Sequence, residues 1–243
     1  MIRYDLHLHS CLSPCGDTDM TVNNIIGMAQ LKGLQLIALT DHNTCANTPA
    51  LQKAAQGTGL CCLYGMELTT SEEIHAVCLF DTPQEAQCFS GYVYERLPGI
   101  LNDEAIFGEQ LILDETDTVI GHENKLLINA TEISIFDLDS LMERFGGIYF
   151  PAHVDKSSNS VFSALGVYPQ ELCTPLCEFA HLENWEKLRE QFPQGRETAL
   201  LSSSDAHYLW DIREGQAVPD SPRAMRVLLE KFPRLRGALE EFL

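Results

Sequence analysis

Short apolar runs alternate with amphipathic segments along most of this 243-residue chain, and this alternation constrains its fold more than any other feature. Strands that alternate with helical segments are typical of a parallel sheet built from β-α units. Seven such units predict an α/β fold, a distorted seven-stranded (β/α)7 barrel of the TIM type, with an open doubly wound sheet as the alternative. The expected strands are Ile2–His9, Gln35–His42, Leu60–Glu67, Ile74–Phe80, Gly147–His153, Cys177–Leu182 and Thr198–Asp205.

Helical segments lie between these runs, and glycine marks where several of them end. Gly33, Gly57 and Gly146 directly follow three of the segments, and glycine is preferred just past a helix C-terminus. The expected helices are Val22–Lys32, Pro49–Gln56, Asp137–Phe145, Trp185–Phe192 and Arg223–Phe232.

Residues 81–145 interrupt the alternation and are strongly acidic, with fourteen Asp and Glu against three Lys and Arg. Their first part has a helical pattern, and Gln110–Ile112 and Leu126–Ile133 have weak strand patterns. We expect a single domain over residues 1–243 that carries 81–145 as an acidic insertion or cap. Ordinary solvated surface is the alternative interpretation of this segment.

The whole chain is acidic, with 16 Lys and Arg against 35 Asp and Glu and a net charge of −19. Such a charge repels long nucleic acids and anionic membranes, so a small phosphorylated substrate is the expected partner. The sequence has no run of about 18 apolar residues, and its start lacks the pattern of a signal peptide. The nine cysteines include no Cys-x-x-Cys pair, which favours reduced thiols. We therefore expect a cytoplasmic protein; the sequence does not indicate its oligomeric state.

Six of the eight histidines lie on or just after five different expected strands. Most fall at the C-terminal ends of those strands, which is the edge where α/β barrels place catalytic groups; His75 is the exception, early in its strand. Imidazole and carboxylate ligands suit Zn²⁺, Mn²⁺ or Fe²⁺, and eight or nine such groups are enough for two or three ions. The six histidines are His7, His9, His42, His75, His153 and His207; Glu67 ends a further expected strand, and Asp205 ends the strand that His207 follows.

These residues belong to short motifs whose order resembles that of the polymerase-and-histidinol-phosphatase (PHP) superfamily. The motifs are Asp-Leu-His-Leu-His-Ser at 5–10, Thr-Asp-His-Asn-Thr at 40–44, Gly-Met-Glu at 65–67, His75, Pro-Ala-His at 151–153 and Ser-Asp-Ala-His at 204–207. They span residues 5–207, and only the acidic segment falls outside the match. The resemblance implies a distorted seven-stranded barrel with a trinuclear metal centre that hydrolyses phosphate esters.

The resemblance also implies a ligand set for each ion. The first ion would be held by His7, His9, Glu67 and Asp205; the second by Glu67, His75 and His153; the third by His42, His207 and a residue of the loop after the first strand. Family members usually have Ser-Asp-Gly in that loop, whereas this chain has Ser-Pro-Cys-Gly-Asp-Thr-Asp at 13–19. Counting back from Thr21 as the helix N-cap gives Asp17 as the ligand, with Asp19 and Cys15 as alternatives.

The implied reaction is attack of a metal-bound hydroxide on phosphorus, with Glu67, Asp205 and His207 as catalytic residues. Lys156, Arg213 and His181 follow three of the expected strands and are candidates for binding the substrate, although such residues are more often solvated surface.

The short form without polymerase domains is similar to phosphoesterases that act on nucleotide 3′,5′-bisphosphates or short oligonucleotides. Histidinol-phosphate phosphatase is the alternative within the family. A metal-dependent amidohydrolase and a non-catalytic metal-binding regulatory module are alternatives from other classes.

Overall fold

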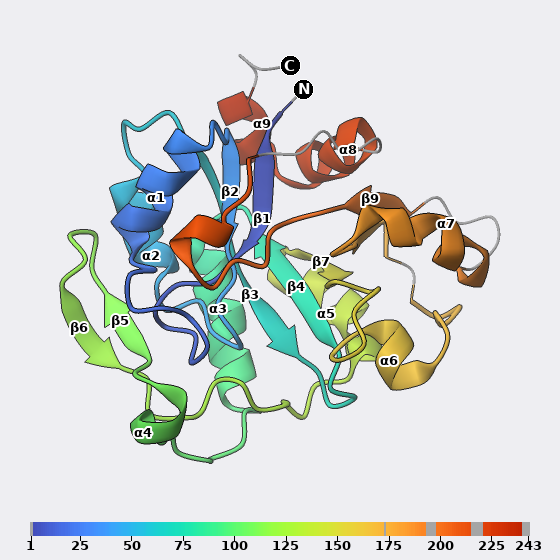
Figure 1. The fold of residues 1–243 in the computed structure, drawn as a ribbon, viewed down its shortest axis with the longest axis horizontal. Helices are drawn as coiled ribbons and strands as arrows, with labels where there is room; N and C mark the ends of the chain where they lie inside the picture. Colours follow the sequence, from blue (N-terminus) through green and yellow to red (C-terminus); the bar gives the residue numbers. More distant parts are fainter. Residues whose placement is uncertain (1, 173, 193–197, 215–220, 240–243) are drawn as a thin grey trace.

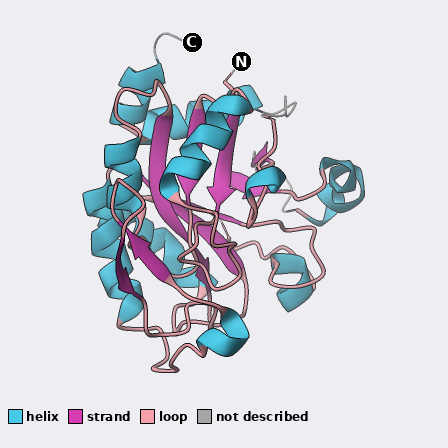
Figure 2. Ribbon diagram, turned by 60° about the vertical axis from the view of Figure 1, so that its left-hand side comes forward, coloured by secondary structure: helices cyan, strands magenta, loops and turns pink. Residues whose placement is uncertain are grey.

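The computed structural model describes residues 2–172, 174–192, 198–214 and 221–239. Its centre is a curled sheet of five strands in the order β1-β2-β3-β4-β7, with two smaller two-stranded sheets, β5-β6 and β8-β9. In Figure 2 helices flank the main sheet on one side, whereas loops cover most of the other side. The strands are β1 (Tyr4–Leu8), β2 (Leu36–Leu39), β3 (Cys61–Thr69), β4 (His75–Phe80), β5 (Leu111–Leu113), β6 (Val119–His122), β7 (Ile148–Pro151), β8 (Leu176–Glu178) and β9 (Ala199–Leu201).

The seven expected strands and five expected helices all form, with shifted ends. The weak strand expected at Leu126–Ile133 is wrong: the partner of β5 is β6, which lies just beyond a tight turn around Asp117. The α-helices are α1 (Val22–Leu31), α2 (Thr48–Ala54), α3 (Pro83–Tyr94), α4 (Glu104–Phe107), α5 (Leu138–Phe145), α6 (Val161–Leu165), α7 (Trp185–Leu188), α8 (Ser221–Lys231) and α9 (Pro233–Leu239); short 3₁₀ turns are η1 (Ile135–Asp137), η2 (Leu182–Asn184), η3 (Arg189–Gln191) and η4 (Leu209–Asp211).

The expectation that all strands of the main sheet are parallel is wrong for β4. This strand is antiparallel to both of its neighbours, β3 and β7. Only five residues, 70–74, connect β3 to β4, and a parallel crossover needs a dozen or more. The reversal places the first residue of β4, His75, at the same edge as the last residues of β3 and β7, opposite Thr69 in the pairing.

Gly65 of the Gly-Met-Glu motif allows this antiparallel pair to pack closely. A Cβ atom at Gly65 would lie 2.0 Å from the carbonyl oxygen of Cys78 on β4. Any other residue would therefore push β4 away from β3 and displace Glu67, two residues further along the same strand.

The pair β8-β9, with the residues after it, contacts both end strands of the main sheet; in Figure 1 β9 lies on the side of β7. The backbone N–H of Val154, after β7, donates to the carbonyl of Glu178 on β8 at 2.8 Å. At the other side the N–H of His9, after β1, donates to the carbonyl of Ala206 at 3.0 Å. One backbone-to-backbone hydrogen bond on each side, together with side-chain hydrogen bonds such as that from Leu6 N–H to Ser203 Oγ, thus connects β8-β9 and the residues after it to both ends of the curled sheet.

Segment 81–145 packs against the main sheet at both of its ends. Phe89 of α3 and Leu138 of α5 are fully buried in the main hydrophobic core. Its middle part carries the β5-β6 hairpin, which contacts the loops that follow β1 and β2. Leu113 N–H donates to the Asn47 side chain, and Leu127 packs with Leu12 in a small second core.

Among the described residues, no helix is both long enough and apolar enough to cross a membrane.

Candidate metal centre

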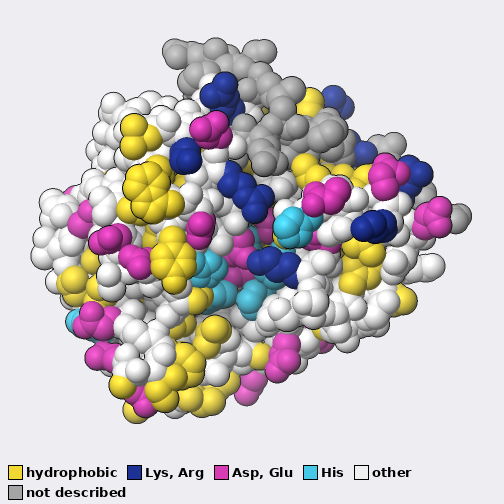
Figure 3. Space-filling model, viewed as in Figure 1, with side chains coloured by type: hydrophobic (Ala, Val, Ile, Leu, Met, Phe, Trp, Pro, Cys, Tyr) yellow, Lys and Arg dark blue, Asp and Glu magenta, His cyan; other side chains and the backbone are white. Residues whose placement is uncertain are grey.

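Six histidines and two carboxylates converge at the edge of the sheet where β1, β2, β3, β7 and β9 end and β4 begins. Three groups of side chains each bring potential ligand atoms within 4.8 Å of one another. The groups are His7, His9, Glu67 and Asp205; His42, Glu67 and His75; and His9, His42 and His207. Figure 3 shows histidine and acidic side chains together in a hollow of this face.

The carboxylate of Glu67 is at the centre of the cluster and is only 1% exposed. Five imidazole nitrogens surround its two oxygens. Its Oε1 lies 3.2 Å from His7 Nε2, 2.9 Å from His75 Nδ1 and 3.0 Å from His153 Nε2, and its Oε2 lies 3.3 Å from His9 Nε2 and 3.2 Å from His42 Nδ1. A carboxylate has about four lone-pair positions for hydrogen bonds, so this arrangement exceeds what Glu67 accepts as an ordinary buried acid.

Hydrogen bonds at the far side of three rings fix which nitrogen is free to bind a metal. His7 Nδ1 lies 2.8 Å from Oε2 of Glu178, a buried carboxylate that can only accept. His207 Nδ1 lies 2.9 Å from the carbonyl oxygen of Asp205. In both rings the Nδ1 carries the hydrogen, so the Nε2 lone pair is available.

His9 is oriented through a relay of two further residues. Ser13 Oγ donates its single hydrogen to Asp41 Oδ1 at 2.8 Å, so it accepts from His9 Nδ1 at 3.0 Å. His9 Nε2 therefore faces Glu67 and Asp205, and in the neutral ring it carries the lone pair that a metal ion would take. Asp41 also accepts from the backbone N–H and the hydroxyl of Ser10, which ties the loop after β1 to the end of β2.

The donor set fits divalent metal ions. His7 Nε2, His9 Nε2, His42 Nδ1 and Asp205 Oδ1 are buried and have no hydrogen-bond partner among the described residues. Ligand atoms bound at about 2.0–2.2 Å in tetrahedral or octahedral geometry lie roughly 3.0–3.5 Å from one another. The nitrogen-to-oxygen separations around Glu67, 2.9–3.3 Å, lie close to this range. These orphaned atoms are what a bound ion would satisfy.

The cluster is strongly coupled electrostatically. Burial alone would lower the pKa of His9, but Asp205 and Glu67 raise it to about 9. Burial would raise the pKa of Glu67, but His75 and the other imidazoles hold it well below its usual range. Burial lowers the pKa of His207 to about 4, assisted by the nearby His9. Because Glu67 stays ionised and His207 stays neutral, both are in the form that binds a cation.

Backbone strain coincides with this edge. His153 has a φ of 28° and Asp205 a φ of 54°, in the region that residues other than glycine rarely adopt. Such strain persists only where the surroundings impose it, and it clusters at functional sites. Here the strained residues follow β7 and β9. Their backbone conformation turns His153 and Asp205 toward the centre of the cluster.

The three groups contain seven of the nine expected metal ligands. His153 joins them through its contact with Glu67, whereas Asp17 lies outside. Asp17 Oδ1 accepts from the N–H of Asp19, and its own N–H donates to the carbonyl of His207 at 2.9 Å. Asp17 thus lies beside the cluster through its backbone. Cys15 of the same loop has its pKa raised to about 12 by burial and by Glu67.

The three candidate substrate-binding residues differ in their surroundings. Lys156 forms an ion pair with Asp205 Oδ2, and this carboxylate raises the pKa of Lys156 against the effect of burial. His181 is 62% exposed and lies 3.8 Å from Glu183. Arg213 lines a small cavity together with Tyr4, Asp5 and Ser202–Ser204.

Sequence reasoning missed Glu178 as a functional residue. Its carboxylate is 2% exposed and contacts His7 Nδ1 and the backbone N–H of His153. The signal available was a single acid inside the apolar strand around Cys177 and Phe179. Such an acid is rarely buried without a partner.

A family model for the PHP domain matches residues 5–145. The chain belongs to the PHP domain family. Among sequences, 80 residues are 34% identical to a 5′-3′ exoribonuclease of Haemophilus influenzae, covering 32% of this chain and 28% of that protein. A match of 79 residues is 30% identical to an uncharacterized protein of Methanocaldococcus jannaschii, covering 29% of this chain and 46% of that protein. The match thus spans less than half of either relative.

Solved structures share the fold of this PHP domain over most of its length. A proposed metal-dependent phosphoesterase from Bifidobacterium adolescentis aligns with a TM-score of 0.64 at 17% identity, covering 94% of this chain and 96% of that one. An amidohydrolase from Chromobacterium violaceum aligns with a TM-score of 0.61 at 18% identity, covering 93% of this chain and 96% of that one. The lesion-specific endonuclease PfuEndoQ from Pyrococcus furiosus aligns with a TM-score of 0.56 at 17% identity, covering 86% of this chain and 49% of that one.

Proposed function

We propose that this PHP domain is a metal-dependent phosphoesterase that hydrolyses small phosphate esters of the nucleotide 3′,5′-bisphosphate or short-oligonucleotide type. It would use two or three divalent ions of Zn, Mn or Fe. The observation that carries the proposal is the convergence of five imidazole nitrogens on the buried carboxylate of Glu67, with Asp205 and His207 alongside. Family membership and the exoribonuclease relative support it.

The bound ions would supply a nucleophile at neutral pH and stabilise negative charge on the phosphoryl oxygens. Glu67 would join two of the ions, and Asp205 and His207 would each hold one beside the substrate. Glu178, Ser13 and the carbonyl of Asp205 keep three histidine rings in the required tautomer. Lys156 would place its ammonium near a phosphate oxygen, and its ion pair with Asp205 at the cluster supports this role.

Exposed aromatic side chains support a nucleotide substrate over histidinol phosphate. Tyr208 is 54% exposed and Trp210 is 82% exposed, although both lie within three residues of His207. Leu209 between them packs against the core and fixes the turn η4. In Figure 3 hydrophobic side chains lie beside the histidine-lined hollow, on the side where Figure 1 places this turn. Stacking of one base on such a ring contributes roughly 1–3 kcal/mol.

The charge of −19 supports a small substrate, because a long polyanion would be repelled outside the metal centre. Endonuclease Q has been crystallised with a 27-mer duplex carrying an abasic lesion, and it aligns with this chain at a TM-score of 0.50 and 16% identity. A preference for short substrates over duplex DNA is thus a specific expectation for this chain.

The first test combines elemental analysis of protein purified without chelator with a phosphate-release screen. We expect between two and three ions per chain and release of phosphate from a nucleotide 3′,5′-bisphosphate, with slower release from histidinol phosphate. The proposed enzyme function would be contradicted by less than one ion per chain after soaking in metal, together with equal phosphate release by chelated and untreated protein. Amine release from an amide substrate without phosphate release would instead favour an amidohydrolase, and metal binding without any turnover a regulatory module.

The nucleotide class is tested by removing the aromatic rings. Tyr208→Ala and Trp210→Ala should raise KM for a nucleotide bisphosphate by about tenfold each and leave KM for p-nitrophenyl phosphate unchanged. Tyr94→Ala, at the exposed end of α3, is the matched control. Equal changes with both substrates would contradict base stacking.

We further propose that Asp17 supplies the last ligand of the third ion. The hydrogen bond from its backbone N–H to the carbonyl of His207 supports this, because it holds Asp17 next to a residue of the cluster. Asp17→Asn should then lower the metal content by about one ion, whereas Asp19→Asn and Cys15→Ser should not; the opposite pattern would assign the ligand to one of them.

We also propose that β8-β9 completes a distorted seven-stranded barrel, and that within the acidic segment 81–145 residues 95–133 act as the cap. The backbone hydrogen bonds at Val154 and His9 support the first proposal, and the contacts of the β5-β6 hairpin with the loops after β1 and β2 support the second.

A further inference from the structure

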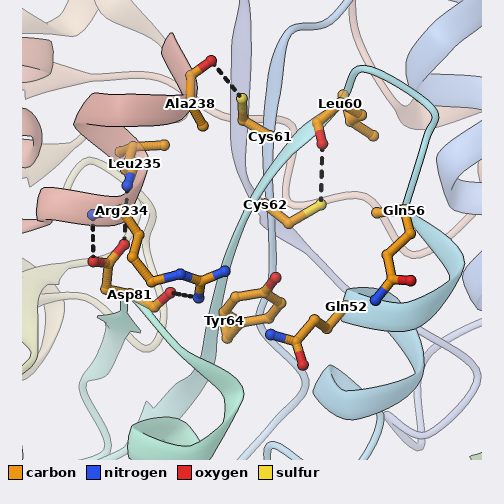
Figure 4. Close-up of a pocket in the computed structure, with 11 residues that line it drawn as sticks. Gln52, Gln56, Leu60, Cys61, Cys62, Tyr64, Asp81, Arg234, Leu235 and Ala238 are labelled. Atoms are coloured by element: carbon orange, nitrogen blue, oxygen red, sulfur yellow. Dashed lines mark hydrogen bonds between the residues drawn. The ribbon is translucent and has the colours of Figure 1, made fainter. Parts of the chain in front are cut away.

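A second cavity lies at the opposite end of β3 from Glu67. Its volume is about 380 Å³, and it is bounded by β3, by the end of α2 and by α9. Figure 4 shows the guanidinium of Arg234 and the carboxamide of Gln52 on either side of the ring of Tyr64. The metal centre and its aromatic neighbours contribute no residue to this cavity.

Arg234 is held at the cavity without a charged partner. Its Nη1 donates to the backbone carbonyl of Asp81 at 2.9 Å. The carboxylate of Asp81 is instead occupied by the backbone N–H groups of Arg234 and Leu235, at 2.8 and 3.1 Å, where it caps the start of α9. No described carboxylate lies within ion-pair distance of the Arg234 guanidinium. The guanidinium is thus held by a backbone carbonyl and keeps its charge for a ligand in the cavity.

The other polar groups of the cavity can also donate hydrogen bonds. Gln52 on α2 and Gln56, two residues beyond its end, present carboxamides for which the described part of the chain offers no hydrogen-bond partner. Burial raises the pKa of Tyr64 to about 12, so its hydroxyl keeps its proton at neutral pH. Leu60, Leu235 and Ala238 provide the apolar part of the lining.

We propose that this cavity binds a small organic monocarboxylate, with its carboxylate on Arg234 and Tyr64 and its apolar part against Leu60, Leu235 and Ala238. A guanidinium matches a carboxylate with two parallel hydrogen bonds. The single cation and the nearby charge of Asp81 disfavour a phosphate dianion, which needs more positive charge than the cavity holds. A volume of about 380 Å³ is at the small end of the range for ligand sites.

The test is calorimetric titration of the metal-loaded protein with acetate, propionate, benzoate and N-acetylglycine. Saturating inorganic phosphate is added to occupy the metal centre, because carboxylates also bind metal ions. We expect at least one acid to bind with the same Kd with and without phosphate. Arg234→Met should raise that Kd by roughly tenfold to a hundredfold, and Tyr64→Phe by about fivefold.

Arg236→Met is the matched control, since Arg236 is an exposed arginine two residues along the same helix. It should leave the Kd unchanged. The backbone cap of α9 by Asp81 does not use the Arg234 side chain, so Arg234→Met should fold; if its circular dichroism differs from wild type, Tyr64→Phe decides. Competition by phosphate, equal affinity of Arg234→Met and Arg236→Met, or no binding of any of the four acids at about 10 mM would each overturn the proposal.

Discussion

Polar side chains cluster at both ends of strand β3, and the two clusters differ in how deeply they are buried. At one end Glu67 is buried, and five imidazole nitrogens surround its carboxylate. At the other end Arg234 and Gln56 are exposed and border an open cavity. Buried polar atoms without partners cost free energy, so the first cluster is tolerable only with an ion, whereas water can satisfy the second. The comparison teaches that burial, more than residue type, distinguishes the cluster that can bind metal from the cavity proposed for a carboxylate.

The largest effect should come from Glu67→Gln. The amide keeps the size of Glu67 but removes the charge that the five imidazoles and the ions share, so kcat for phosphate release should fall by at least ~10³-fold. Bound metal should fall in parallel. Arg234→Met, at the other end of the same strand, should keep kcat within about twofold, because it is distant from the centre. Comparable losses in both variants would mean that the two ends are not separate sites.

Removal of the metal should also lower stability, since the ions bind only the folded cluster. A ligand present at about 1,000 times its Kd adds about 4 kcal/mol to the free energy of unfolding, which corresponds to roughly 8–16 °C in Tm for a chain of this size. Scanning calorimetry with and without a chelator measures this difference. The same shift should be seen in Arg234→Met. An unchanged Tm after the ions are removed would show that the buried nitrogens are satisfied in another way.

A smaller effect is expected from Glu178→Gln, which keeps the shape of the group that orients His7 but reduces its strength as an acceptor. Partners of metal-bound histidines typically change metal affinity by about 10–100-fold. Titration with Zn²⁺ against a competing chelator gives the Kd. Glu183→Gln, whose side chain is 75% exposed near His181, is the control and should match wild type. A change in kcat with unchanged metal affinity would argue against a positioning role.

Much of the metal edge could be predicted from the sequence because its signal is local. His7 and His9 alternate with apolar residues, and His42, His153 and His207 lie at or just after the ends of three further expected strands, so one rule on strand ends places all five. The position of His75 could not be derived that way. It depends on the reversal of β4, which follows from a connection too short for a crossover.

Other parts of the molecule depend on long-range pairing that the sequence does not carry locally. Glu178 contacts His7 across 171 positions of sequence. Arg234 reaches Asp81 across 153 positions, and neither residue belongs to a motif. The strand Val119–His122 was not predicted, because the turn residues of the surrounding acidic run obscure its strand pattern. Packing of α9 on β3 creates the second cavity, so no pattern within either element predicts it.

The smallest effect is expected from a substitution of Glu72, which lies at the same edge of the sheet as Glu67. Glu72, in the turn between β3 and β4, accepts from Ser134 Oγ and from the N–H of Ile135, and so caps η1. Partial burial opposes ionisation, but these hydrogen bonds hold the pKa of Glu72 below its usual 4.5. A carboxylate whose pKa is lower in the folded state stabilises the protein above about pH 4.5 and loses that contribution as the pH falls through the folded value. Glu72→Ala should therefore cost about 0.5–1.5 kcal/mol at pH 7 and less at pH 4, measured by urea unfolding of chelator-treated protein. Its kcat should equal that of Glu132→Ala, the exposed control. If Glu72→Ala loses activity as Glu67→Gln does, the edge as a whole, and not the buried cluster alone, determines catalysis.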